Sequence, residues 1–202
     1  EIRFPRLKKV TQMITYMPHF ISMVAIAGLI SLVLDRQSGI VNLIITSLGG
    51  EAVNFMGKSS AYRTIYVVSE IWQHTGWNTI IYLSALSTVD AETLEAARID
   101  GANRLQKILY IDVPAILPTI VILLIMRSGT VLNIGFEKVY LLQNDLNRDV
   151  SEVISTYTYR LGILEGQFSY TTAIGLFNNA INAAILILVN QISRSVGETS
   201  LW

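Results

Sequence analysis

Long apolar stretches alternate with polar segments along the chain. Four of these stretches approach or exceed the length of about 20 apolar residues with which a helix crosses a bilayer core of ~30 Å. They cover residues 10–34, 63–89, 115–134 and 168–192. The pattern therefore predicts an all-α fold, a polytopic transmembrane helical bundle with about four spans in this chain.

Two of the predicted spans contain residues that disturb a plain apolar helix. Pro18 lies in the first span, and a kink is expected there because proline removes a backbone hydrogen bond. Glu70 and His74 interrupt the second span, which is the weaker one. A carboxylate is costly in the middle of a membrane, so Glu70 is expected either near the outer interface or facing protein or water.

Polar segments separate the predicted spans. Residues 35–62 and 137–167 are expected outside, the first with room for a short interfacial helix. Residues 90–118 form the most charged stretch and must lie in water, and their apolar positions recur at helical intervals on both sides of Gly101. This pattern predicts two short amphipathic helices joined by a turn.

Composition agrees with a membrane protein and excludes several kinds of site. The chain is 51% hydrophobic and 15% charged, with a mean hydropathy of +0.47. Lys and Arg balance Asp and Glu at 15 each, so no basic surface points to nucleic acid. The absence of cysteine excludes disulfides, thiolate metal sites and cysteine nucleophiles. His19 and His74 lack a second ligand at metal-binding spacing, so no metal site is predicted.

Residues 95–114, which read EAARIDGANRLQKILYIDVP, form the most distinctive stretch. A helix that fits into a groove on another protein must be short, stiff and small on one face. Ala96 and Ala97 provide such a face, and Gly101 permits the sharp turn between the two predicted helices. The stretch is therefore typical of a docking element.

Charged residues and prolines complete this stretch. Glu95 and Asp100 are suited to capping backbone donors or to meeting basic residues of a partner. Pro114 and Pro118 are expected to fix the chain where the third span begins, since a helix start tolerates missing donors. The result is a predicted lever tied rigidly to membrane helices. The alternative is an amphipathic helix that only rests on the bilayer.

The spacing resembles the cytoplasmic signature of permeases of binding-protein-dependent ABC importers. That signature is Glu-Ala-Ala, three residues, glycine, nine residues and Ile-x-Leu-Pro, and Val113 stands where leucine is usual. The resemblance implies that the ATPase-coupling residues are Glu95, Ala96, Ala97, Asp100, Gly101, Ala102, Ile111 and Pro114. The stretches that resemble the polysaccharide and oligosaccharide branch of the family are residues 16–22, 135–138, 155–160, 175–178 and 197–202.

The resemblance covers nearly the whole chain and implies its organisation. Residues 1–202 are expected to form a single transmembrane permease domain, with a cytoplasmic coupling loop at 90–118. The family usually has about six spans, so two N-terminal spans are expected to be missing here. The implied location is the bacterial inner (plasma) membrane, which the chain crosses several times.

The resemblance also implies partners. They are a second homologous permease subunit, a dimeric ABC ATPase, an extracytoplasmic solute-binding protein, a saccharide substrate and the lipid bilayer, with no nucleic acid. The sequence has no Gly-rich phosphate loop of the Walker type, so ATP and Mg are expected in the partner ATPase. The chain itself is expected to have no cofactor, no catalytic residue and no enzyme activity.

Polar or small residues within and beside the later spans are candidates for the solute pathway. Arg127 is the cation that suggests an acidic saccharide, and pairing with a carboxylate or reaching an interface are the alternatives. The asparagines are as well explained by hydrogen bonds between helices, and the tyrosines by an interfacial aromatic belt. The candidates are Arg127, Gly129, Asn133, Tyr157, Tyr159, Asn178 and Asn182.

Three other functions compete with saccharide import. An ABC permease for a non-sugar solute, such as an amino acid or a metal chelate, would carry the same coupling loop. A membrane scaffold without transport activity would not need the spaced residues of the loop. An intramembrane enzyme would need a nucleophile with a base, or metal ligands, on facing spans, and the sequence offers no such set.

Overall fold

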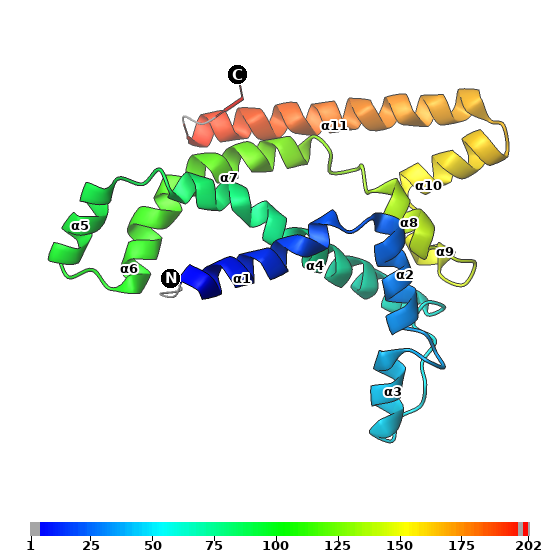
Figure 1. Ribbon diagram of the computed structural model, residues 1–202. Helices are drawn as coiled ribbons and strands as arrows, with labels where there is room; N and C mark the ends of the chain where they lie inside the picture. The colour runs from blue at the N-terminus through cyan, green and yellow to red at the C-terminus, as the bar shows by residue number, and fades with distance from the viewer. Residues whose placement is uncertain (1–4, 198–199, 202) are drawn as a thin grey trace. The chain divides into compact units, whose positions relative to one another are not determined.

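The computed structural model describes residues 5–197 and 200–201, and over these residues the secondary structure is entirely helical (Figure 1). The predicted all-α class is confirmed. Residues 1–4 and three residues of the last stretch with family resemblance, Glu198, Thr199 and Trp202, lie outside the described part. The helices are α1 Pro5–Tyr16, η1 Met17–Phe20, α2 Met23–Val33, α3 Ile40–Ser47, α4 Ser59–Leu86, α5 Ala91–Ile99, α6 Arg104–Lys107, η2 Ile108–Asp112, α7 Val113–Ser128, α8 Phe136–Leu142, α9 Arg148–Ser151, α10 Ile154–Tyr159, η3 Arg160–Leu164 and α11 Phe168–Val196.

Two continuous helices of the described chain are long and apolar enough to cross a membrane. They are Arg104–Ser128, which joins α6, η2 and α7, and Phe168–Ser195 within α11. The bent pair Arg6–Phe20 and Met23–Val33 makes a third if it is counted as one span. α4 has 28 residues and is thus ~42 Å long. It is long enough to cross a bilayer but more polar than the other two.

The first predicted span is broken rather than kinked. The helices on either side of the break meet at 101°. Pro18 lies in the short 3-10 helix η1, where its missing N–H is tolerated, and the Ser22 hydroxyl then accepts from the Ala25 N–H at 3.3 Å to start α2. A proline followed by a helix N-cap ends one helix and begins another.

The chain divides into two compact units, and the first unit comprises residues 5–77 and 133–172. Its small core joins Ala27 of α2, Tyr62 of α4 and Leu142 of α8. Beside this core, the Asn144 and Asn147 amides both donate to the Met56 carbonyl, at 2.8 and 3.0 Å. The two predicted external segments are therefore packed together, and the second is largely helical rather than an open loop.

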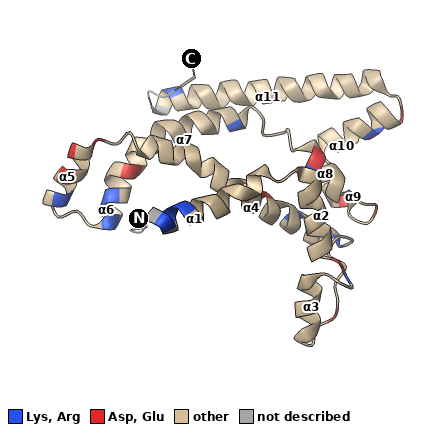
Figure 2. Ribbon diagram, viewed as in Figure 1, with Lys and Arg blue, Asp and Glu red and all other residues tan. Residues whose placement is uncertain are grey.

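The second unit comprises residues 78–132, 173–197 and 200–201. Here α7 and α11 lie side by side (Figure 1), and a Cβ added at Gly129 would come 2.9 Å from the Leu186 side chain. The Leu132 N–H donates to Asn182 Oδ1 at 3.4 Å. Charged side chains gather on α5 and α6, whereas α7 and α11 are almost free of them (Figure 2). The charged residues of this unit are thus concentrated in the predicted aqueous loop, and the long helices are mainly apolar.

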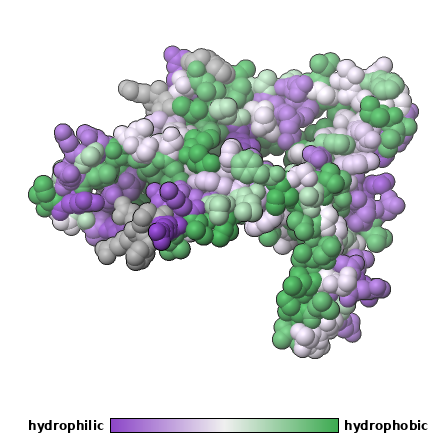
Figure 3. Space-filling view, viewed as in Figure 1, coloured by the Kyte–Doolittle hydropathy of each residue, from purple (hydrophilic) through white to green (hydrophobic). Residues whose placement is uncertain are grey.

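Large hydrophobic side chains cover much of the outer surface. Figure 3 shows hydrophobic residues over the viewed side of α2 and α3. Leu32 of α2 is 67% exposed, and Leu48, which follows α3, is 82% exposed. An apolar surface of this extent is typical of a protein that faces lipid or other subunits.

The packing of α1 against α4 gives a prediction. A Cβ at Gly76 would collide with the backbone carbonyl of Thr15, which cannot rotate away. We expect Gly76→Ala to cost about 1–3 kcal/mol and to lower the apparent melting temperature of the detergent-solubilised protein. Gly28→Ala is the control, because a Cβ there meets nothing within 4 Å and alanine favours the helix. Equal melting temperatures for the two variants would contradict the packing.

Candidate functional site

The predicted turn at Gly101 is present and has a defined hydrogen-bond pattern. Asp100 ends α5, and Gly101 follows with a φ of +74° in the left-handed region. The Ala102 N–H donates to the Ala97 carbonyl at 2.9 Å and the Gly101 N–H to the Arg98 carbonyl at 3.2 Å. This pair of bonds is a Schellman motif, which satisfies the last carbonyls of the helix. Three of the predicted coupling residues, Ala97, Gly101 and Ala102, therefore take part in the bonds of this turn.

The helices of the loop are capped by residues that the sequence analysis did not single out. The Asp90 carboxylate accepts from the Glu92 N–H at 3.2 Å and starts α5. Asn103 starts α6 with a capping box: its Oδ1 accepts from the Gln106 N–H at 2.9 Å, and its own N–H donates to Gln106 Oε1 at 2.8 Å. The Asn-x-x-Gln spacing is the signal that would have revealed this start.

Glu95 and Asp100 do not cap these helices, so the prediction of a capping role was wrong. Glu95 lies in the middle of α5 and Asp100 at its C-terminal end, where backbone carbonyls rather than N–H groups lack partners. Both residues are exposed. Their carboxylates face solvent and are accessible to a partner.

Pro114 lies in the first turn of α7, as predicted, whereas Pro118 lies inside that helix. The continuous helix Arg104–Ser128 includes both prolines and begins well before Pro114. Ile111 lies in the π-helical turn η2 directly before this proline. Proline lacks an N–H and crowds the carbonyl four residues earlier, and a π turn relieves both problems without ending the helix. The loop is therefore joined to the membrane helix without a hinge.

The loop exposes apolar side chains although it is the most charged part of the chain. Ile99 is 87% exposed and Tyr110 is 77% exposed. Leu105 is also exposed, on α6. Exposed apolar groups among charged residues are typical of a surface that docks on another protein.

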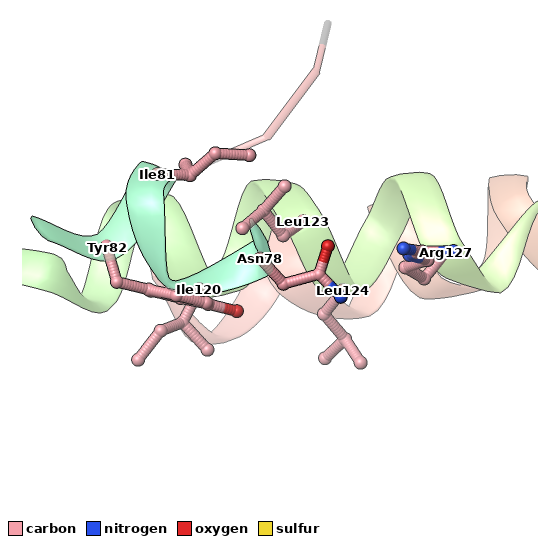
Figure 4. A pocket seen from close by; sticks show the side chains of 7 residues that line it. All are labelled: Asn78, Ile81, Tyr82, Ile120, Leu123, Leu124 and Arg127. Carbon is pink, nitrogen blue, oxygen red and sulfur yellow. The ribbon is translucent and has the colours of Figure 1, made fainter. Parts of the chain in front are cut away.

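A cavity of about 300 Å³ lies between the end of α4 and α7 in the second unit. Asn78, Tyr82 and Arg127 are its polar residues, and in Figure 4 the Asn78 amide lies between the Tyr82 hydroxyl and the Arg127 guanidinium. No carboxylate of the described residues pairs with Arg127, which is exposed. The remaining lining is apolar: Ile81, Ile120, Leu123 and Leu124. Such a cavity suits an anionic group beside hydroxyls.

Among the other pathway candidates of the second unit, the structure places two in helix packing. Asn182 is 4% exposed and accepts from the Leu132 backbone, which agrees with the alternative of a hydrogen bond between segments. Gly129 allows the close approach of α7 to Leu186. Asn178 lies on α11, whereas Asn133, which follows α7 in the sequence, belongs to the first unit. None of these four lines the cavity beside Arg127.

Tyr157 and Tyr159 belong to the first unit and lie in different surroundings. Tyr159 packs against Phe136 and Tyr140, with ring centroids 5.0 and 5.3 Å away. Arg160 lies 5.4 Å from the centre of the Tyr157 ring. A hydrogen bond with Tyr170 raises the pKa of Tyr157, and one with Glu152 raises the pKa of Arg160. Both tyrosines are thus engaged with neighbouring protein groups.

One polar cluster was missed altogether. Lys138 of α8 is 2% exposed and pairs with Glu70 of α4 at 2.8 Å, while its ammonium lies 5.0 Å from the centre of the Tyr66 ring. His74 contacts the same carboxylate, and His19 contacts His74. Glu70 therefore faces protein, one of the two predicted positions. The only sequence signal was the Glu70–His74 pair, four residues apart in an otherwise apolar stretch.

The sequence profile of the family described as "Binding-protein-dependent transport system inner membrane component" matches residues 2–198. The chain belongs to this family. Its members are components of transport systems, so membership agrees with the helical membrane fold and with the resemblance carried by residues 95–114.

Two curated proteins are similar to this chain along its whole length. The chain is 42% identical, over all 202 of its residues, to the polygalacturonan/rhamnogalacturonan transport system permease protein YteP of Bacillus subtilis. It is 40% identical over the same length to the Bacillus subtilis protein LplB. The chain spans 63% and 64% of these two relatives, which is less than two thirds of their length.

Solved structures of the family share the fold. One is a bacterial alginate ABC transporter in complex with an alginate pentasaccharide-bound periplasmic protein: the TM-score is 0.96 at 37% identity, over 100% of this chain and 70% of that one. Another is a bacterial ABC transporter involved in the import of the acidic polysaccharide alginate, with a TM-score of 0.94 at 38% identity. It covers 97% of this chain and 68% of that one.

The turn of this permease-family loop gives a second prediction. Gly101→Val forces a branched side chain to a φ of +74°, at a cost of about 1–2 kcal/mol, whereas Gly101→Asn tolerates that conformation better. Hydrogen exchange of residues 91–103 should therefore speed up strongly for valine and little for asparagine. Gly135→Val is the control, since Gly135 has φ −55° and open space around it. Equal exchange in all three variants would contradict a turn that requires glycine.

Proposed function

We propose that the chain is the membrane-spanning part of a permease subunit of a bacterial ABC importer. In this proposal it sits in the inner membrane and translocates an oligosaccharide or polysaccharide fragment that an extracytoplasmic binding protein delivers. The observation that carries the proposal is the exposed loop 90–118, in which the residues of the family signature form a helix, a Schellman turn and a helix continuous with α7.

The loop would act as the coupling element to a dimeric ABC ATPase that binds ATP and Mg. Its exposed apolar side chain Ile99 and the small Ala96 suit a groove on that partner. Because Arg104–Ser128 is one helix, a push on α5 would pass through the short turn 100–103 directly into the membrane helix. Closure of the ATPase pair would then shift the permease between its inward-open and outward-open states, together with a second homologous subunit.

The solute is proposed to be an acidic saccharide. The support is the cavity where Arg127 lies beside Asn78 and Tyr82, because a guanidinium binds a carboxylate in a bidentate way and an amide binds hydroxyls. Relatives point to the same class of solute: one is named for polygalacturonan and rhamnogalacturonan transport, and one structure concerns the acidic polysaccharide alginate. A neutral sugar would not need the guanidinium of Arg127.

Coupling is tested with the reconstituted complex of both permease subunits, the ATPase and the binding protein. We expect Gly101→Asp and Glu95→Ala to lower saccharide-stimulated ATP hydrolysis and uptake by about tenfold or more, the equivalent of ~1.4 kcal/mol. Glu92→Ala and Gly135→Asp are matched controls outside the signature, and they should keep wild-type rates. If the signature variants insert normally and transport at full rate, the loop is not the coupling element.

The acidic-solute proposal is tested by uptake of acidic and neutral oligosaccharides of equal length. Arg127→Gln should reduce uptake of the acidic one by about 10–100-fold, since a charged hydrogen bond contributes about 1.5–3 kcal/mol. Arg127→Lys should restore part of it. A matching loss for both kinds of sugar would assign Arg127 a structural role instead.

A further inference from the structure

The short helix α3 exposes apolar side chains along one side. Ile40, Leu43 and Ile44 are each more than half exposed. Residues three and four positions apart lie on the same side of a helix, so these side chains form one apolar strip. Figure 3 shows hydrophobic residues over one side of the α2–α3 segment and hydrophilic residues over the other. Within the described chain, nothing buries the strip.

Asn42 holds α3 in place from the side that faces away from the strip. Its Nδ2 donates to the backbone carbonyls of Asp35 and Val53, at 2.9 Å each, and its Oδ1 accepts from the Val53 N–H at 2.8 Å. Asn42 is buried. Three hydrogen bonds to one buried amide fix the rotation of the helix about its axis. The apolar strip therefore points outward in one direction.

A polar hollow of about 450 Å³ borders the apolar strip. Arg36, Gln37 and Thr46 are among the polar residues that line it. Leu43 also lines the hollow, although its side chain belongs to the strip. A cationic hollow and an apolar surface thus meet at Leu43.

The charge of Arg36 is available to a ligand. Arg36 is exposed and pairs with no carboxylate of the described residues. The neighbouring Asp35 is engaged in its own turn, where Oδ1 accepts from the Ser38 N–H at 2.7 Å, the Ser38 hydroxyl at 2.8 Å and the Gln37 N–H at 3.0 Å. The bonds from Ser38 lower the pKa of Asp35 because they stabilise its ionised form.

The position of α3 in the chain places it beside the membrane. α2 is the second half of the bent pair that counts as a candidate span, and α3 begins shortly after α2 ends. A segment so close to a membrane helix lies near the bilayer surface. At that depth an apolar strip meets acyl chains, and a guanidinium meets lipid phosphates.

We propose that α3 lies in the external surface of the membrane and that the hollow at Arg36 binds the headgroup of an anionic phospholipid. The acyl chains of this lipid cover the strip formed by Ile40, Leu43 and Ile44. A phospholipid fits because its phosphate and its acyl chains are joined in one molecule, as the hollow and the strip are joined at Leu43. A guanidinium binds two phosphate oxygens at once. The site requires a membrane location but neither the coupling loop nor a particular solute.

Single cysteines test the lipid contact, because the chain contains no other cysteine. In lipid nanodiscs, a bimane label at Ile44→Cys should lose most of its fluorescence to phosphatidylcholine that carries a nitroxide on its acyl chain. Iodide in the buffer should quench it little. The control is the same label at Asp145→Cys, an exposed position of the other external segment, which should respond in the opposite way.

Two outcomes of the quenching experiment would overturn the proposal. A label at Ile44→Cys that iodide quenches and the nitroxide lipid does not would place the strip in water. A label that neither agent reaches would show that a protein partner covers the strip.

The headgroup site is tested with the nitroxide carried by phosphatidylglycerol. For the Ile44→Cys label, quenching should require about fivefold less of this lipid than of phosphatidylcholine, since one basic residue near the surface contributes about that factor. Adding Arg36→Gln should remove the preference, and Arg36→Lys should retain part of it. Lys58→Gln is the control, because Lys58 is an exposed cation that does not line the hollow.

The same measurement separates a lipid from a free anion. Inorganic phosphate in the buffer should leave the preference for phosphatidylglycerol unchanged at constant ionic strength. A preference that persists in Arg36→Gln, or one that inorganic phosphate abolishes, would contradict a phospholipid site at Arg36.

Discussion

The Schellman turn at Gly101 is the constraint on which the coupling part of the structure depends. Two backbone hydrogen bonds close it, and only a left-handed residue at that position allows both. The turn ends α5, and after Ala102 and Asn103 the next helix runs from Arg104 to Ser128 without a break. A short exposed helix, which we propose to contact the ATPase, is thereby joined by a tight turn to a membrane-length helix.

Much of this arrangement was predictable from sequence because it is local. The all-α class follows from the length of the apolar stretches, and the turn follows from a glycine between two short amphipathic patterns. The capping roles assigned to Glu95 and Asp100 failed because acidic residues cap only the first turn of a helix, and the actual caps are Asp90 and Asn103. The π turn before Pro114 was also not foreseen, since no composition signal distinguishes it from a helix start.

The features that sequence reasoning missed are contacts between distant residues. Glu70 and Lys138 are 68 positions apart, and His19 and His74 are 55 apart. Hydrophobic periodicity predicts that each element is a helix but carries no information about which polar side chains meet across helices. The sequence predicted only a kink in the first span, whereas the structure has a break at residues 21–22. A proline alone predicts a kink, and the cap at Ser22 turns it into a new helix start.

The composition of α4 follows from these contacts. Glu70 and His74 serve the ion pair and the histidine pair of the first unit, and Asn78 and Tyr82 line the cavity beside Arg127 in the second. A helix with polar positions for two purposes is less apolar than α7 or α11, which explains why its sequence reads as the weakest span. In the proposed importer, α5 and its turn contact the ATPase. Because the chain has no cysteine, single-cysteine crosslinking in the assembled complex tests it most directly. We expect Ile99→Cys to crosslink to the ATPase subunit, and we expect no such crosslink from Ile163→Cys, which is also exposed but lies in the predicted external segment. A crosslink from Ile163→Cys with none from Ile99→Cys would contradict the proposed contact.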